Sequence, residues 1–160
     1  MIQSVKVLDH ISVTVSNMER SLAFYCNTLG LKEVEHHRLE GDTISKMAGK
    51  PGVIMEVRRL AAPGTPNILL DLQQYVSPHG KLSGAKLGDV AHAHFCFGLP
   101  DVWAAYRELL AKGIEFVSEP VSFDLDWGIV HVVFMKDPDG FIIELVQSPI
   151  EIKPGHKAPG

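Results

Sequence analysis

Two histidines and two carboxylates stand in matched positions in the two halves of this chain and could bind one metal ion between them. His10 and Asp71 lie in the first half, and His94 and Glu144 lie in the second. Each lies in an apolar stretch that predicts a strand, where a carboxylate is costly unless it is paired or bound to a metal. Imidazole and carboxylate ligands suit Zn, Fe(II), Ni, Co or Mn and leave positions for water or substrate. We therefore expect these four residues to form a site for one divalent metal ion.

The elements that would position these residues form an internal repeat. His10 precedes a helix cap at Asn17 by seven residues, and His94 precedes a cap at Asp101 by the same seven. In both halves a strand is followed by a capped helix, a closing glycine and three further strands, which predicts two βαβββ modules. One module alone could not bury both faces of its sheet. We therefore expect the two modules to pack together in an α+β fold.

The predicted modules span residues 1–80 and 89–148, and the tail at 149–160, rich in proline and glycine, is expected to be flexible. Within the modules we expect strands at 5–15, 31–38, 53–60, 67–75, 90–99, 114–117, 128–135 and 141–147, helices at 18–29 and 102–112, and irregular connections at 39–52 and 61–66.

Three further residues could contact a substrate. His92 lies two residues before His94, hence on the same strand face, and could be the ligand itself or an acid–base partner. The matched spacing to the helix cap favours His94. His131 alternates within a predicted strand and could line the cleft, and Arg59 or its neighbour Arg58 could bind a substrate carboxylate or phosphate. The alternatives are hydrogen-bonded core histidines, carboxylates on a solvated strand face and arginines on the surface.

Composition excludes several classes of protein. The chain has 160 residues, of which 46% are hydrophobic and 21% charged, the balance of one globular domain. A net charge of −4 without a basic patch argues against a nucleic-acid partner, and no apolar run approaches the roughly 20 residues of a membrane span. Two cysteines, Cys26 and Cys96, are too few for a disulfide scaffold. They predict buried thiols in a reducing, cytoplasmic compartment.

Three segments carry a family likeness: DHISVTVSNMERSLAFYCNTLGL, HFCFGLPDVWAAYRELLAKGI and FMKDPDGFIIELVQ. Together they resemble the vicinal oxygen chelate superfamily, over nearly the whole of residues 5–147. That superfamily includes glyoxalase I, methylmalonyl-CoA epimerase, extradiol dioxygenases and fosfomycin- or bleomycin-resistance proteins. The resemblance implies an open, barrel-like mixed sheet around a shared cleft, and a homodimer. It also implies that Trp127 borders the substrate, with a core-capping role as the alternative.

By this resemblance the family's metal ligands fall on His10, Asp71, His94 and Glu144. Glyoxalase I and the epimerase usually have Glu or Gln where this chain has Asp71. Because aspartate is one methylene shorter, Asp71 could bind through water or not at all. Extradiol dioxygenases use two histidines and one carboxylate, which the other three residues would supply.

The resemblance implies a divalent-metal isomerase or lyase of the glyoxalase or epimerase type. Its substrate would be small and carry vicinal oxygens, as in an α-hydroxy ketone, a hemithioacetal or a β-keto-acid thioester. The metal would act as a Lewis acid that stabilises an enediolate or enolate. Glu144 would remove and return the proton on carbon, with Asp71 as its partner on the opposite face. The alternatives are a non-haem Fe(II) dioxygenase of the extradiol type and a metal-free small-molecule binding protein of the resistance type.

Overall fold

The computed structural model describes residues 7–157, apart from the side chains of residues 65–68. The chain forms two compact units, the first running to Ser83 and the second beginning at Gly84. Each unit contains one open mixed sheet with few helices, so the expected α+β class is confirmed. Among the described residues, no helix is long and apolar enough to cross a membrane.

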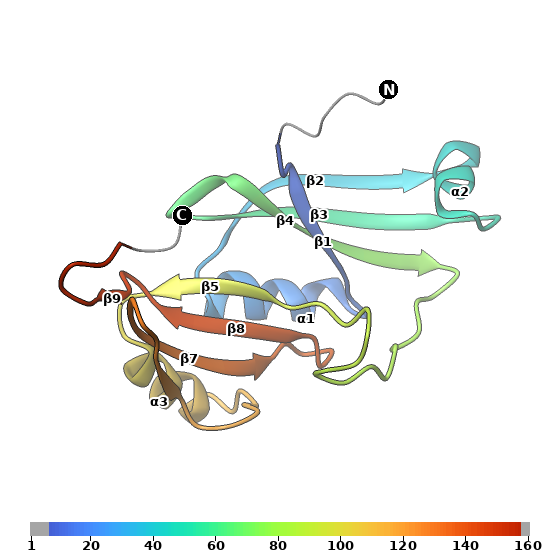
Figure 1. Cartoon of the computed structure of the whole chain (residues 1–160). Coiled ribbons are helices and arrows are strands. Elements are labelled where there is room, and N and C mark those ends of the chain that lie inside the picture. The colour runs from blue at the N-terminus through green and yellow to red at the C-terminus, as the bar shows by residue number, and fades with distance from the viewer. Residues whose placement is uncertain (1–6, 158–160) are drawn as a thin grey trace. The chain divides into compact units, whose positions relative to one another are not determined.

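The first sheet has four strands in the order β1-β4-β3-β2 (Figure 1). β1 pairs with β4 in parallel, whereas the other two pairings are antiparallel. All four strands were predicted, with ends that differ by a few residues, and positions 5 and 6 of the first prediction lie outside the described residues. The strands are β1 (His10–Thr14), β2 (Lys32–Glu40), β3 (Ile54–Ala62) and β4 (Thr65–Ser77).

The helix of the first unit begins where the sequence predicts it. Helix α1 (Met18–Leu22) is capped by Asn17, whose side chain accepts a hydrogen bond from the backbone N–H of Arg20 at 2.9 Å. The helix continues as a π-helical stretch, η1 (Ala23–Thr28). Gly30 follows with a φ of 82°, a left-handed conformation that ends a helix and favours glycine.

The connection expected at residues 39–52 contains a second helix, α2 (Asp42–Ala48), so this expectation is wrong. α2 buries a single apolar residue, Ile44, in a cluster with Met55 and Val57 of β3. One buried side chain in seven residues gives no helical periodicity to detect in the sequence. The helix therefore depends on its contact with the strand.

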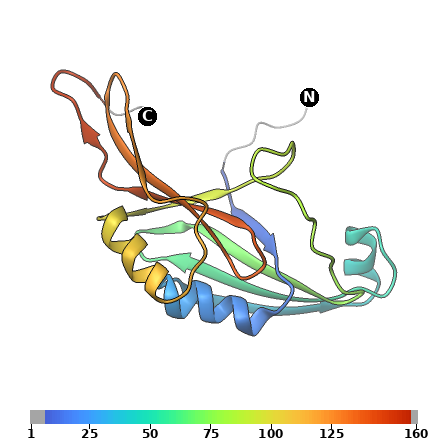
Figure 2. The same ribbon diagram turned by 90° about the horizontal axis from the view of Figure 1, so that it is seen from below.

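The second sheet repeats the order of the first as β5-β8-β7-β6, with a fifth strand, β9, paired to β7. β5 and β8 are parallel, and the remaining pairings are antiparallel. Figure 2 shows the hairpin of β6 and β7 with β9 beside it. The elements are β5 (Phe95–Leu99), α3 (Val102–Ala111), β6 (Val121–Asp124), β7 (Gly128–Lys136), β8 (Ile142–Gln147) and β9 (Glu151–Ile152).

Three expectations for the second unit need correction. The strand predicted at 90–99 begins only at Phe95, because its partner β8 pairs with this part alone. The stretch 114–117 contributes one isolated bridge, at Phe116, and the second strand of the module is β6 instead. The tail expected to be flexible forms β9 against the start of β7.

The two units cap their helices in the same way, which supports the repeat. Asp101 caps α3 as Asn17 caps α1, each accepting a backbone hydrogen bond at 2.9 Å. Gln74 of β4 accepts a hydrogen bond from the first backbone N–H of α1 at 2.7 Å. Gln147 of β8 does the same for α3 at 3.4 Å. The match therefore extends from the first strand of each unit to the last.

Each sheet buries the face that carries its helix, since α1 lies against β4 and α3 lies against β7 and β8. Leu72 on β4 and Ile143 on β8 are fully buried on these faces. Neighbouring residues of a strand point to opposite faces. Asp71 and Glu144 therefore lie on the faces that the helices leave uncovered.

Candidate functional site

The second unit brings an imidazole and a carboxylate close together. Nε2 of His94 lies 3.2 Å from Oε2 of Glu144. Glu144 lies in β8, and His94 lies one residue before β5, the parallel neighbour of β8. The two side chains are 40% and 22% exposed, so solvent reaches both. The His94 ring also packs edge-on against Phe134, with 5.2 Å between ring centroids, which restricts its orientation.

The first unit orients His10 through a residue that we did not predict. Nδ1 of His10 lies 2.6 Å from Oδ1 of Asp9, and this hydrogen bond lowers the pKa of Asp9. When Nδ1 carries the proton, the lone pair is on Nε2, which lies 3.8 Å from Oδ2 of Asp71. Metal-binding histidines commonly hold a carboxylate on the nitrogen that does not bind the metal. The position of Asp9 directly before His10 was a signal for this role.

Asp71 is held by an arginine. Nε of Arg59 donates to Oδ1 of Asp71 at 2.7 Å, and Nη2 donates to Oδ2 at 2.9 Å. The Asp71 side chain is only 5% exposed, and the guanidinium is its charge partner. The hydrogen bonds to Asp71 raise the pKa of Arg59 above its already high value, so the guanidinium stays charged. Arg59 therefore lies at the predicted site but binds a side chain of the protein.

The strand registers make Asp71 and Glu144 equivalent positions of the two units. Ser12, two residues after His10, lies opposite Asp71 in the parallel pairing of β1 with β4. Cys96, two residues after His94, lies opposite Glu144 in the pairing of β5 with β8. Each unit thus places one imidazole and one carboxylate at the same place on its uncovered face.

The donor set of the second unit fits a divalent metal ion. Two ligands bound at about 2.1 Å to the same ion stand roughly 3.0–3.4 Å apart for angles between octahedral and tetrahedral. The 3.2 Å between His94 and Glu144 lies in this range. His10, with Asp9 on its other nitrogen, also suits a ligand. Over residues 7–157, no group of three or more His, Cys, Asp or Glu side chains could hold a metal ion, and the two imidazole–carboxylate pairs of the candidate site lie one in each unit.

Apolar side chains share the sheet face of Glu144. Glu144 lies opposite Phe134 in the antiparallel pairing of β8 with β7, so Phe134 shares its face. Val132 is on the same face of β7 and is buried. Phe123 on β6 also belongs to this face and is 53% exposed. An exposed aromatic on an edge strand offers a surface against which a small substrate can pack.

His92 and Trp127 lie outside the strands. His92 is half-buried before β5, stacked on Phe141 at 6.4 Å between ring centroids, and its buried Nδ1 has no hydrogen-bond partner within the described part of the chain. Trp127 is half-buried at the tip of the β6–β7 hairpin, where its carbonyl accepts a hydrogen bond from the backbone N–H of Lys153 at 2.9 Å. Their roles toward a substrate remain predictions.

His131 lies on the helix-covered face of β7, opposite to the face of Phe134 and Glu144. Its Nδ1 lies 2.7 Å from Oγ of Ser122 on β6, and its Nε2 lies 3.4 Å from a carboxylate oxygen of Glu151 on β9. The structure therefore separates His131 from Glu144 by the thickness of the sheet. It links three strands, and we do not include it in the site.

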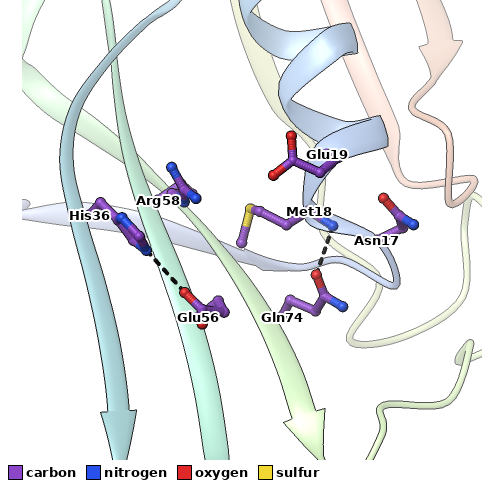
Figure 3. Close-up of a pocket in the computed structure, with 7 residues that line it drawn as sticks. All are labelled: Asn17, Met18, Glu19, His36, Glu56, Arg58 and Gln74. Carbon is purple, nitrogen blue, oxygen red and sulfur yellow. Dashed lines mark hydrogen bonds and ion pairs between the residues drawn. The ribbon is translucent and has the colours of Figure 1, made fainter.

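A pocket of about 420 Å³ lies on the other face of the first sheet, beside the start of α1 (Figure 3). Arg58 lines it, and because Arg58 and Arg59 are neighbours in β3, the sheet separates this pocket from Asp71. His36 and Glu56 in the lining are already paired, with 3.0 Å between Nε2 and Oε2. The pocket is therefore not part of the candidate metal site.

Comparison with known proteins identifies relatives of the whole chain. The family model for the glyoxalase/bleomycin resistance protein/dioxygenase superfamily matches residues 7–145. A lactoylglutathione lyase from Pseudomonas aeruginosa is 27% identical over 153 residues, which cover 90% of this chain and 84% of the relative. A lactoylglutathione lyase from Schizosaccharomyces pombe is 28% identical over 156 residues, covering 92% of this chain but only 49% of the relative. The chain thus spans about half the length of the yeast protein.

Solved structures show the same fold. A glyoxalase family protein from Bacillus cereus superposes with a TM-score of 0.77 over 92% of this chain and 98% of its own, at 18% sequence identity. The likeness confirms the expected fold, and at this identity it bears on the fold alone.

Proposed function

The chain belongs to the glyoxalase/bleomycin resistance protein/dioxygenase superfamily, and we propose that it is a divalent-metal-dependent lyase or isomerase of the glyoxalase type. The observation that carries the proposal is the pair of His94 and Glu144, 3.2 Å apart on an uncovered sheet face beside apolar side chains. The relatives named lactoylglutathione lyase support a lyase reaction. They also make hemithioacetals, the adducts of a thiol and an aldehyde, the first substrate class to examine.

We propose that His10, His94 and Glu144 hold the metal ion. A bound divalent ion would act as a Lewis acid toward two adjacent oxygens of the substrate. Asp9 keeps the His10 ring in the orientation that leaves Nε2 free. Phe134 packs edge-on against the His94 ring and restricts its orientation. Direct coordination by Asp71 is not part of this proposal, whereas a homodimer and a cytoplasmic location stay predictions.

Glu144 is the group that we propose moves the proton. Its carboxylate shares a sheet face with the side chains of Phe134 and Val132 and lies 3.2 Å from His94, at the proposed metal site. It would take the proton from the carbon next to the substrate oxygen and return it to the adjacent carbon. The role of Asp71 as the partner on the opposite face stays a prediction and is not part of this proposal. Arg59 already donates a hydrogen bond to each of its two carboxylate oxygens.

The test is metal content and turnover, measured on protein purified without chelator. We expect near-stoichiometric Zn, Ni, Co or Mn and turnover of a hemithioacetal, with turnover lost in Glu144→Gln. Glu119→Gln makes the same change at an exposed position and should retain both properties. Circular dichroism checks that both variants fold. Full turnover in Glu144→Gln would refute the assignment of this residue, and a wild-type chain that takes up no metal would favour a metal-free binding protein.

An Fe(II) dioxygenase is the second candidate, and a specific observation favours it. With both oxygens of Asp71 bound by Arg59, the remaining donors are His10, His94 and Glu144. Two histidines and one carboxylate are the ligand set of many non-haem iron oxygenases. Oxygen consumption that requires both Fe(II) and a catechol would identify this activity. Turnover of a hemithioacetal without any such oxygen consumption would exclude it.

A further inference from the structure

Arg59 places a positive charge beside Asp71, whereas the equivalent position beside Glu144 is Phe134. We propose that Arg59 is a positioning residue that keeps the Asp71 carboxylate out of the metal coordination sphere, so that the first unit supplies His10 as its only ligand. This inference rests on the proposed metal site and deepens it, because it assigns the number of protein ligands.

The geometry of the pair leaves Asp71 little freedom to bind an ion. Arg59 lies directly opposite Asp71 in the antiparallel register of β3 and β4, and its guanidinium holds one oxygen at 2.7 Å and the other at 2.9 Å. The side chain of Asp71 is 5% exposed. Its Oδ2 lies 3.8 Å from Nε2 of His10, beyond the roughly 3.0–3.4 Å between adjacent ligands at octahedral to tetrahedral angles. Coordination by Asp71 would therefore require its carboxylate to move relative to His10 and to share its charge with Arg59.

Further carboxylates near Arg59 hold its guanidinium on this face of the sheet, beside Asp71. Nη1 of Arg59 also lies 3.4 Å from Glu35 on β2, the strand on its other side. Asp9 adds a further negative charge near the guanidinium. Arg59 therefore sits in a row of carboxylates across the sheet face, and Asp71 is the one that it binds with two hydrogen bonds.

The second unit shows what the same position looks like without this arginine. Glu144 lies between Cys96 on β5 and Phe134 on β7, in the places that Ser12 and Arg59 occupy around Asp71. Neither Cys96 nor Phe134 carries a positive charge. Glu144 therefore has no partner on the neighbouring strands like the guanidinium that binds Asp71, and its carboxylate can bind an ion together with His94. An octahedral ion held by three protein ligands would have three positions left for substrate or water, one more than an ion held by four.

Titration of the metal-free protein with Co²⁺ tests the inference, because the visible d–d absorption of Co²⁺ reports its ligand set without any turnover. We expect Asp71→Asn to change the Co²⁺ dissociation constant by less than about threefold and to leave the spectrum unchanged. Glu144→Gln should weaken Co²⁺ binding by more than about 100-fold, beyond what changes outside the ligand set usually cost. Arg59→Met should release Asp71, so that Co²⁺ binds more tightly and its spectrum changes. The double variant Arg59→Met/Asp71→Asn should return to the wild-type spectrum.

The inference is overturned if Asp71→Asn weakens Co²⁺ binding as much as Glu144→Gln does. It is also overturned if folded Arg59→Met shows the wild-type spectrum and affinity. If Arg59→Met does not fold, the Co²⁺ affinity of Asp71→Asn alone tests the inference. This variant should fold, because the Asn amide oxygen can still accept a hydrogen bond from Arg59. If the wild-type chain binds no Co²⁺, the proposed metal site is refuted as well. If the wild-type chain binds Co²⁺ strongly and Asp71→Asn weakens that binding, only the role of Arg59 is refuted.

Discussion

Cys96 lies directly opposite Glu144 in the parallel pairing of β5 with β8, and the two side chains influence each other. Burial around the thiol, together with the charge of Glu144, raises the pKa of Cys96 to about 12. The expectation of two buried thiols is wrong, since Cys96 is exposed as a residue and Cys26 is half-buried. The pairing with Glu144 makes the thiol of Cys96 harder to deprotonate.

This pairing predicts a slow reaction of Cys96 with iodoacetamide. Only the thiolate reacts, so with a pKa of about 12 the rate at pH 8 should be about a thousandfold below that of an unperturbed thiol. The rate should keep rising as the pH increases toward the pKa. Glu144→Gln removes the negative charge, lowers the pKa of Cys96 and should speed alkylation at a given pH. Mass spectrometry of a Cys26→Ser background measures this, and an unchanged rate in Glu144→Gln would contradict the coupling.

Asp9→Asn should weaken metal binding without unfolding the protein. Asp9 orients His10 by a 2.6 Å contact to Nδ1, and loss of such a carboxylate typically costs 10- to 100-fold, roughly, in metal affinity. Competition with a chromophoric chelator measures the affinity. Glu119→Gln removes a charge at an exposed position and serves as the control. Equal affinity in Asp9→Asn and the control would show that His10 needs no such support.

Arg59→Met should lower the stability of the metal-free protein. The substitution leaves the buried Asp71 carboxylate without its partner, and breaking a buried pair in this way costs about 3–5 kcal/mol in the free energy of unfolding. Arg59→Met/Asp71→Leu removes both charges and should recover most of the loss. Urea unfolding followed by circular dichroism compares the variants. Additive effects of the two single substitutions would mean that the pair contributes nothing to stability.

Gly128→Ala should loosen β9. A Cβ at position 128 would lie 2.3 Å from the carbonyl oxygen of Glu151, so the strands must separate or the new methyl group must clash. We expect faster amide exchange at Lys153, whose N–H bonds to the carbonyl of Trp127, and a loss of about 1–3 kcal/mol in the free energy of unfolding. Gly64→Ala is the matched control, since nothing lies within 4 Å of its added methyl group. Protection of Lys153 equal to that of the control would contradict the close approach.

The features that the sequence predicted correctly are those encoded by local patterns. The caps Asn17 and Asp101 were visible because a short polar side chain before an amphipathic run satisfies free backbone N–H groups of the first turn. The matched spacing of His10 and His94 from these caps identified the repeat. Alternating apolar residues located the long strands of both sheets. Each of these signals comes from residues within a few positions of one another.

The errors came from elements whose existence depends on a distant partner. The edge strand β6 has exposed side chains throughout, so burial left no pattern in its sequence. The stretch 90–94 alternates like a strand but has no strand pairing in the structure. Helix α2 is held by contact with β3. In each case the backbone conformation depends on hydrogen bonds or packing that the local sequence does not encode.

The candidate site divides in the same way. The candidate metal ligands could be predicted from the sequence, because a carboxylate in an apolar strand is costly and its equivalent recurs in the second half. Strand pairing, which the sequence does not show, places Arg59 on Asp71 and Phe134 opposite Glu144. It also places His131 on the opposite face from Glu144. The physical reason is strand register: a shift of one residue exchanges the two faces of a strand, and that register is set by pairing with residues far away in the chain.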